Sequence, residues 1–398
     1  MSAPTAGLPW RVPGALAATQ IVHWGSLFYA FSVLMPAIAA EMGWQRETVV
    51  GAFSAALLAE AAAAVLVGTL LDRIGARRVM AVGSLAAGLG LLAAGQVTNL
   101  WQLYMVWICL GVVMATTLYE ASFAAVTAAF GAQAARRGIA VVVFAGGLAS
   151  TVAWPLTGAM VTELGWRDAC AILALANALC ALPHLFLLPR KAQPDTRLVV
   201  LQPALVPAVE PGLTDAIRQP RFWGLAFVYA VVGVCTATIA VHLVPLLQER
   251  GLGAAATQVA SLFGVAQVAG RIMEFLAGRR WSLRATGIVA LAIVTPAFLC
   301  LASATADWVL AAAVLFYGAA NGALTIVRGA LPSRMFGTAH YGAIAGALAG
   351  CGALARSAGP IAVAALWQQG GGYTSAMLGL AALAVAALAV FVLVTRRA

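Results

Sequence analysis

Six ionisable side chains stand within long apolar stretches, where their charges could bind a solute inside a membrane. They are Glu60, Glu120, Arg271, Glu274, Arg328 and Arg356. An ionised group at membrane depth is costly, so such residues normally face a bundle interior or an aqueous cavity and pair with another group. A guanidinium can hold a carboxylate bidentately, whereas a buried carboxyl group is protonated unless it is paired. These residue types favour binding of an organic anion, transfer of a proton, or both.

The three arginines differ in depth. Arg356 lies about 14 residues into its apolar stretch, roughly 21 Å along a helix axis, and either binds an anion or pairs two helices. Arg271 lies about 12 Å from the next basic loop, and it either binds an anion or is neutralised by Glu274. Arg328 is three residues from Leu331 at the end of its stretch, which favours a snorkelling or gate role over substrate contact.

The remaining candidates are acids and neutral polar groups. Glu60 and Glu120 stand near the centres of their stretches, where they either carry a coupled proton or pair with an arginine across a cavity. His23 can titrate near neutral pH or act as a neutral hydrogen-bonded group. Tyr29 and Asn321 can face the cavity or join helices. We assign substrate binding to Arg271, Arg356, Tyr29, Asn321 and His23, and proton coupling or ion pairing to Glu60, Glu120 and Glu274.

Nothing in the sequence suggests a catalytic or cofactor site. The apolar stretches hold no His/Glu spacing typical of a metal site, and the six cysteines all fall within apolar stretches as small buried side chains. Lys191 is the one lysine among 23 basic residues, and no basic face on a soluble domain suggests a nucleic-acid partner. We expect a protein that is not an enzyme, with no cofactor and no metal.

Composition places these residues in a membrane. Of the 398 residues 63% are hydrophobic and only 9% are charged, far from the composition of soluble domains. Apolar stretches of about 20 residues predict spanning helices. The predicted spans are 12–40, 48–71, 79–95, 103–130, 139–161, 169–188, 222–247, 254–277, 285–303, 308–331, 342–366 and 373–394.

Charge distribution predicts the orientation. With the N-terminus inside, 17 basic residues fall in cytoplasmic segments and three in spans, and the outer loops hold Arg46, Arg167 and Arg250. The positive-inside rule then places both termini in the cytoplasm. Residues 190–221 carry five prolines and divide the chain into a six-helix half at 1–189 and another at 222–398. Residues 276–284 align with 70–78 as a weak internal repeat.

A polar turn lies between the second and third predicted spans. It reads Gly68-Thr-Leu-Leu-Asp-Arg-Ile-Gly-Ala-Arg-Arg78, or G-x-x-x-D-R-x-G-x-R-R. This string resembles the loop between helices two and three of major facilitator superfamily transporters. The resemblance implies an all-α fold of twelve transmembrane helices, two six-helix halves around a central cavity, and transport by alternating access. It also implies a gating loop made of Gly68, Asp72, Arg73, Gly75, Arg77 and Arg78, in which Gly68 permits close helix contact and Gly75 a sharp turn.

Shorter strings point to one branch of that superfamily. They are Trp24-Gly25, Phe28-Tyr29, the turn at 41–46, Gly270-Arg271, Pro360 and Gly371-Gly-Tyr373. They look like segments of the monocarboxylate and oxalate/formate-antiporter-like transporters. Residues 146–158 are similar to the superfamily's antiporter motif but depart from its glycine pattern, which leaves the direction of transport open.

Two functions follow from these residues. The first is secondary transport of a small organic anion, a carboxylate by the branch resemblance, in a bacterial inner membrane with a monomer in the lipid bilayer. The alternative is a proton-coupled efflux pump for apolar or cationic compounds, in which Glu60 and Glu120 bind the cation.

Overall fold

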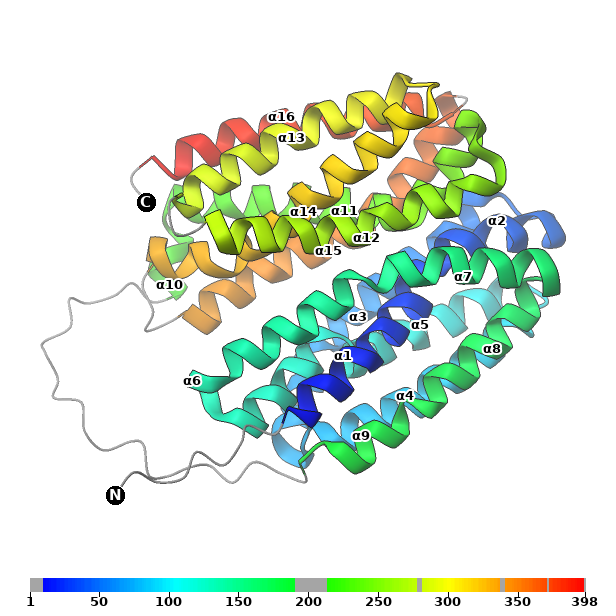
Figure 1. Ribbon diagram of the computed structural model, residues 1–398, viewed down its shortest axis with the longest axis horizontal. Coiled ribbons are helices and arrows are strands. Elements are labelled where there is room, and N and C mark those ends of the chain that lie inside the picture. Colours follow the sequence, from blue (N-terminus) through cyan, green and yellow to red (C-terminus); the bar gives the residue numbers. More distant parts are fainter. Residues whose placement is uncertain (1–9, 190–212, 278–280, 337–340, 371, 397–398) are drawn as a thin grey trace, which may run out of the picture.

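The computed structural model describes residues 10–189, 213–277, 281–336, 341–370 and 372–396, and these residues form a bundle of long helices (Figure 1). The N-terminal half contains α1 (Arg11–His23), η1 (Trp24–Tyr29), α2 (Phe31–Met42), α3 (Arg46–Ile74), α4 (Ala76–Ala94), α5 (Leu100–Thr117), α6 (Tyr119–Gly147), α7 (Ala149–Leu164), α8 (Trp166–Leu179) and α9 (Ala181–Leu187). The C-terminal half contains α10 (Leu213–Ile217), α11 (Pro220–Leu247), η3 (Gln248–Leu252), η4 (Gly253–Ala255), α12 (Ala256–Ala277), α13 (Leu283–Ser303), α14 (Asp307–Phe336), α15 (Tyr341–Gly370) and α16 (Thr374–Val394).

Helix lengths fit a multi-pass membrane protein. The described residues contain 11 helical stretches that are long and apolar enough to cross a membrane, and the longest, Pro220–Glu274 with 55 residues, holds both α11 and α12. The chain therefore makes twelve crossings, as the sequence predicts. Helix α1 begins and α16 ends at the same end of the bundle, here called the terminal end, and the opposite end is called the distal end (Figure 1).

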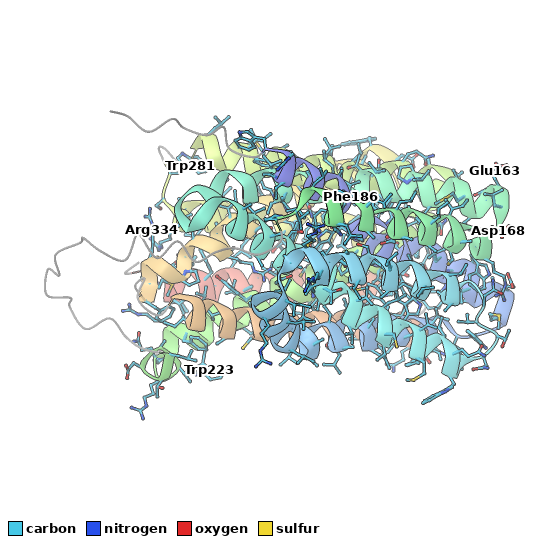
Figure 2. The ribbon with its side chains drawn as sticks, turned by 90° about the horizontal axis from the view of Figure 1, so that it is seen from below. Glu163, Asp168, Phe186, Trp223, Trp281 and Arg334 are labelled. Carbon is cyan, nitrogen blue, oxygen red and sulfur yellow. The ribbon has the colours of Figure 1, made fainter. Side chains whose placement is uncertain are left out.

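Aromatic and charged side chains mark the two ends of the bundle. Trp223 and Trp281 lie at the terminal end with Arg334, whereas Glu163 and Asp168 lie at the distal end (Figure 2). Exposed tryptophans are typical of membrane interfaces, and both Trp223 and Trp281 are more than half exposed, at 56% and 52%. The terminal end therefore carries exposed tryptophans of the kind found at membrane interfaces.

Glycines set how closely the helices pack. Gly111 of α5 lies directly against the Ala56 carbonyl of α3, and Gly270 of α12 lies against the Ala319 carbonyl of α14 in the other half. At both positions a Cβ would overlap the neighbouring backbone. Each half therefore uses a small residue to bring two helix backbones together, which is the usual basis of helix association in lipid.

Three of the interruptions between described helices of the N-terminal half bear on the site. The π-helix η1 separates α1 from α2, extended backbone at Leu118 separates α5 from α6, and the chain breaks at Leu148 between α6 and α7. The chain also folds back within α6. This is shown by the distance of 3.4 Å between the Tyr119 hydroxyl and the Val143 carbonyl oxygen. A straight helix would separate these two residues by roughly 36 Å. Interrupted helices are typical of transporter binding sites.

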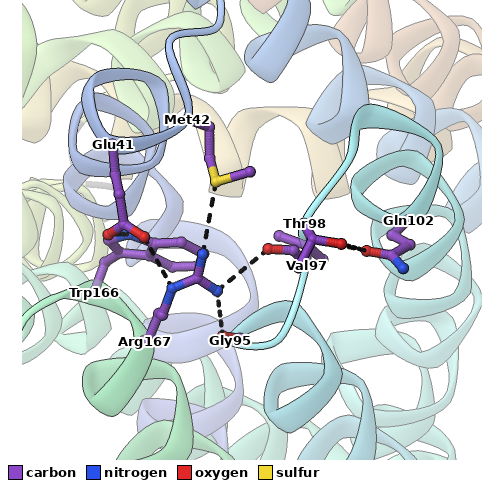
Figure 3. Close-up of polar contacts among 8 residues, drawn as sticks. All are labelled: Glu41, Met42, Gly95, Val97, Thr98, Gln102, Trp166 and Arg167. Atoms are coloured by element: carbon purple, nitrogen blue, oxygen red, sulfur yellow. Dashed lines mark hydrogen bonds and ion pairs between the residues drawn. The ribbon is translucent and has the colours of Figure 1, made fainter.

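A polar cluster at the distal end ties three helices of the N-terminal half together (Figure 3). Glu41 accepts from the Trp166 indole at 2.6 Å and from Arg167 Nε at 2.9 Å. Arg167 Nη1 then donates to the carbonyl oxygens of Gly95, at 2.8 Å, and Val97, at 3.2 Å, which follow α4. The cluster joins the ends of α2, α4 and the start of α8.

The C-terminal half contains a counterpart. Glu249 accepts from the Trp367 indole at 2.6 Å and from the Tyr373 backbone at 3.0 Å, while Arg250 donates to the Ala302 carbonyl at the end of α13. The Tyr373 hydroxyl donates to His242 Nδ1 at 3.0 Å, because a neutral His242 ring already donates from Nε2 to the Pro360 carbonyl at 2.9 Å. Both halves therefore use a carboxylate that accepts from an indole, together with an arginine that donates to carbonyl oxygen at the end of a neighbouring helix.

Two contacts join the halves toward the distal end. Arg46 of α3 stacks on the Trp367 ring of α15 at 4.6 Å, and Thr151 of α7 donates to the Ser261 carbonyl of α12 at 2.8 Å. These contacts hold the halves together at the distal end.

The predicted gating loop has mixed outcomes. Gly75 ends α3 with φ 84°, a left-handed backbone angle that favours glycine, so the predicted sharp turn is confirmed. The prediction of close contact at Gly68 is wrong here, because a Cβ there would meet no atom within 4 Å. Arg73 and Arg78 are exposed and Arg77 is half-buried. The Asp72 side chain and residues 190–212 of the predicted linker lie outside the described part.

Candidate functional site

Arg271 lies where the interrupted helices of the N-terminal half meet α12. Its side chain is buried, with 4% of the residue exposed, and Nη1 donates to the Val143 carbonyl at 2.5 Å. The guanidinium also bonds the Tyr119 hydroxyl. A Cβ on Gly147 would lie 2.5 Å from Nη1, and a Cβ on Gly146 would overlap the Tyr119 hydroxyl. The Gly146-Gly147 pair therefore gives room for both side chains.

Arg356 forms an ion pair that crosses between the halves. Its Nη2 on α15 lies 2.6 Å from Glu60 Oε2 on α3, and the two side chains are 22% and 10% exposed. The guanidinium carbon also lies 6.0 Å from the centre of the Phe28 ring. Of the alternatives for Arg356, the helix-pairing contact is therefore present, and Arg356 is not a cation without a counter-ion in this conformation.

Tyr29 lies near both arginines. Its hydroxyl bonds the Gln267 side chain and is close enough to Arg271 and Arg356 for Coulombic interaction with both. Its backbone carbonyl accepts from the Trp154 indole at 3.0 Å, which fixes the end of η1 against α7. The structure therefore brings together three predicted binding residues from helices far apart in the sequence.

Several nitrogen donors at this place have no acceptor. The Nε atoms of Arg271 and Arg356 and the Nε1 atom of Trp24 are buried, and none has a hydrogen-bond partner in the described part. Buried donors without an acceptor are unfavourable, whereas an entering acceptor would recover the lost hydrogen bonds. All three atoms donate only, so the group they match is an acceptor such as a carboxylate.

The other charged groups surround this centre. Glu120 is exposed, follows the break at Leu118 and interacts electrostatically with Glu60. Arg328 lies over the Tyr229 ring at 5.0 Å and repels Arg356. Glu274 is buried.

Asn321 lies away from this centre, within the C-terminal half. Its side-chain oxygen accepts from the Thr236 hydroxyl at 3.0 Å, which joins α14 to α11. It therefore makes the helix-packing contact that was the alternative for this residue.

His23 faces away from the arginines, into a buried polar network of the N-terminal half. Nδ1 donates to Asn177 Oδ1 at 2.8 Å, and Nε2 lies 3.2 Å from the Ser84 hydroxyl. Ser84 also lies 3.0 Å from His184, and His184 lies 3.1 Å from Thr19. This series of hydrogen bonds joins α1, α4, α8 and α9. His23 therefore matches the alternative expectation of a neutral, hydrogen-bonded histidine.

Three contributors to the site were not singled out from the sequence. They are the Trp24 indole, the Tyr119 hydroxyl and the Gln267 amide. Trp24 had been noted only as part of a family string. Tyr119 and Gln267 are neutral residues in apolar stretches, and only their position next to Arg271 and Tyr29 identifies them.

The larger described cavity lies on the distal side of the arginine centre. It has a volume of about 500 Å³ and is formed by α2, α7, the end of α11 and the start of α12. Pro36, Gly158 and Thr257 line it, and Glu163 is its one charged lining residue. It lies on the seam between the halves, whereas the arginines lie deeper.

Comparison with solved structures supports the fold. The nucleoside transporter NupG (D323A mutant) superposes with a TM-score of 0.78 at 15% sequence identity, covering 98% of this chain and 100% of that one. A bacterial homolog of the human lysosomal transporter Spinster, in an inward-facing and unoccupied conformation, gives 0.74 at 15% identity, with 98% of each chain covered. No curated protein sequence matches the chain. The Major Facilitator Superfamily profile matches residues 17–360, and the chain therefore belongs to the Major Facilitator Superfamily.

Proposed function

We propose that this membrane transporter moves a small organic anion, a carboxylate in the simplest case, by alternating access. The observation that carries the proposal is the convergence of Arg271 and Arg356 on Tyr29, with both Nε donors buried and without an acceptor. A carboxylate would supply the missing acceptor and form charge-assisted hydrogen bonds of about 1.5 to 3 kcal/mol each. A small anion would thus stabilise the residues that enclose it.

The Glu60–Arg356 pair suggests how a proton would be coupled. Protonation of Glu60 removes the charge that holds Arg356, and the substrate carboxylate then replaces Glu60 as its counter-ion. One proton and one anion enter together, so the net charge of the centre does not change. Because the pair also joins α3 to α15, the exchange would loosen a contact between the halves and bias the conformational equilibrium.

Glu120 supports a second candidate. Its carboxyl group is exposed, makes no hydrogen bond or ion pair with the described residues, and lies near Glu60. Two acids facing the same space could bind a cation, as required for proton-coupled efflux of cationic or apolar compounds. That function would not need the donors of Arg271.

The excess of basic residues in the predicted cytoplasmic segments supports a cytoplasmic location of both chain ends. We place the protein in a bacterial inner membrane, with its distal end outside, and expect it to act as a monomer.

Uptake into proteoliposomes tests the choice between the two functions. Radiolabelled acetate and benzoate, and the cation tetraphenylphosphonium, are compared under an imposed pH gradient. Anion transport is supported if carboxylate uptake is lost in Arg271→Gln but kept in the exposed control Arg218→Gln. The efflux function would instead be supported if the pH gradient drives only the cation, and if that movement is unaffected by Arg271→Gln and lost in Glu120→Gln.

A further inference from the structure

Three aromatic rings form a continuous surface beside the arginine centre, here called the aromatic shelf: Trp24, Tyr119 and Phe123. The Trp24 and Tyr119 rings lie 4.9 Å apart, and the Tyr119 and Phe123 rings stack at 5.4 Å with an angle of 11°. All three side chains are only partly buried, unlike Phe28 and Tyr29 behind them. The shelf therefore has accessible ring surface that the protein's own packing does not cover.

The shelf is joined to both guanidinium groups. Tyr119 bonds Arg271, and Trp24 packs at 5.1 Å against Phe28, whose ring lies under Arg356 at 6.0 Å. A carboxylate held by Arg271 or Arg356 would therefore have its organic part against these rings. The helix interruptions at η1 and Leu118 create this arrangement, because Trp24 begins η1 and Tyr119 begins α6.

The size of the shelf decides which acids can use it. An acid with one to three carbons would satisfy the arginine donors but leave most of the ring surface uncovered. A flat ring attached to the carboxylate can stack on Trp24 or Tyr119 and bury apolar area at the same time. The Trp24 Nε1 donor, which has no partner, would lie at the edge of such a ring, where a polar substituent could accept from it.

We propose that the preferred substrate is a carboxylate carrying a planar aromatic ring, with the carboxylate on the arginines and the ring on the aromatic shelf. This inference rests on the proposed anion function, and it adds a specificity determinant that the arginines do not provide. Trp24 is the residue on which the selectivity depends.

Isothermal titration of the purified, detergent-solubilised protein tests the proposal with three acids of graded shape. Benzoate carries a flat ring, cyclohexanecarboxylate carries a ring of similar size that is not flat, and acetate carries no ring. Benzoate should bind tightest, with an advantage over cyclohexanecarboxylate of roughly three- to tenfold. Trp24→Leu should abolish that advantage and weaken benzoate binding more than acetate binding, and Trp24→Phe should keep most of the advantage.

Trp101→Leu is the matched control, because Trp101 is 72% exposed at the start of α5, far along the chain from the shelf. It should leave all three affinities unchanged. Equal affinity for benzoate and acetate, or a benzoate preference that survives Trp24→Leu in a folded variant, would overturn the shelf proposal alone. A different result would overturn the anion function on which the shelf proposal rests. That result is no binding of any of the three acids at concentrations up to about 10 mM, roughly the weakest affinity that titration can measure.

Discussion

Nη2 of Arg356 lies 2.6 Å from Oε2 of Glu60, and this ion pair links the eleventh crossing to the second across the two halves. Neither residue neutralises a charge on its own helix. A pair that spans the moving interface can only persist in conformations that keep α3 and α15 together. Its exchange for a substrate carboxylate would therefore change both occupancy and conformation.

Glu60→Gln is predicted to strengthen anion binding. The amide keeps the shape of the side chain but releases the Arg356 charge, so carboxylate affinity at pH 8 should rise about tenfold. Affinity in the unaltered protein should increase as pH falls, because protonation of Glu60 releases Arg356, and this dependence should be flattened in the variant. Titration calorimetry with benzoate at pH 6 and pH 8 measures both effects. The exposed Glu163→Gln is the control, and weaker binding in Glu60→Gln would contradict the exchange.

Gly147→Ala is predicted to reduce anion binding through Arg271. The added methyl group would lie 2.5 Å from Nη1 and force the guanidinium away from the Val143 carbonyl. We expect a loss of at least about tenfold in carboxylate affinity, corresponding to one charge-assisted hydrogen bond. Gly350→Ala introduces the same methyl group on α15, where no atom lies within 4 Å. Equal binding by the two variants would show that the position of Arg271 does not matter.

Trp367→Leu is predicted to weaken contact between the halves at the distal end. The substitution removes the ring under Arg46 and the indole donor to Glu249, and the cation–π contact alone contributes about 0.5 to 2 kcal/mol. Spin labels at Gln45 and Asp307 would report the distance between the halves by pulsed electron resonance. The variant should gain a longer-distance population, and Trp101→Leu should not. A distance distribution that does not change would exclude Trp367 from this contact.

His23→Leu is predicted to affect stability more than binding. The substitution removes the bonds to Asn177 and Ser84 and leaves both groups buried, at a cost of about 1 kcal/mol or more in the free energy of unfolding. Thermal unfolding should occur several degrees lower while benzoate affinity stays within twofold. Loss of binding at full stability would return His23 to the substrate site.

The orientation can be tested separately. Single cysteines at Gln45 and Arg218, in a background without the native cysteines, should be labelled by a membrane-impermeant maleimide from opposite sides. Position 45 should react in intact cells and position 218 only after permeabilisation. Labelling of both from one side would contradict the twelve-crossing topology.

Much of this fold can be predicted from the sequence because lipid imposes simple rules. Apolar length gives the twelve crossings, and the backbone angle at Gly75 follows from its place between two charged segments of the loop. The exposed tryptophans and arginines mark the ends. What periodicity does not predict is the break at Leu118 or the π-helix at Trp24, since neither is marked by a proline.

The site was predictable in part, for a related physical reason. Charge inside an apolar stretch identifies Arg271, Arg356 and Glu60 because each must find a partner. Which partner it finds depends on tertiary packing, so the sequence left the pairing of Arg356 open and the structure places it on Glu60. Neutral residues such as Tyr119 carry no comparable signal.

Carboxylate binding to Arg271→Gln and Arg356→Gln, measured on folded protein, tests the central claim most directly. Titration of benzoate is performed on both variants and on Arg218→Gln, after thermal unfolding has shown that each is folded. We predict that either variant loses at least about tenfold in affinity, while Arg218→Gln binds like the unaltered protein. Near-parental affinity in a folded Arg271→Gln or Arg356→Gln variant would show that this arginine does not hold the anion.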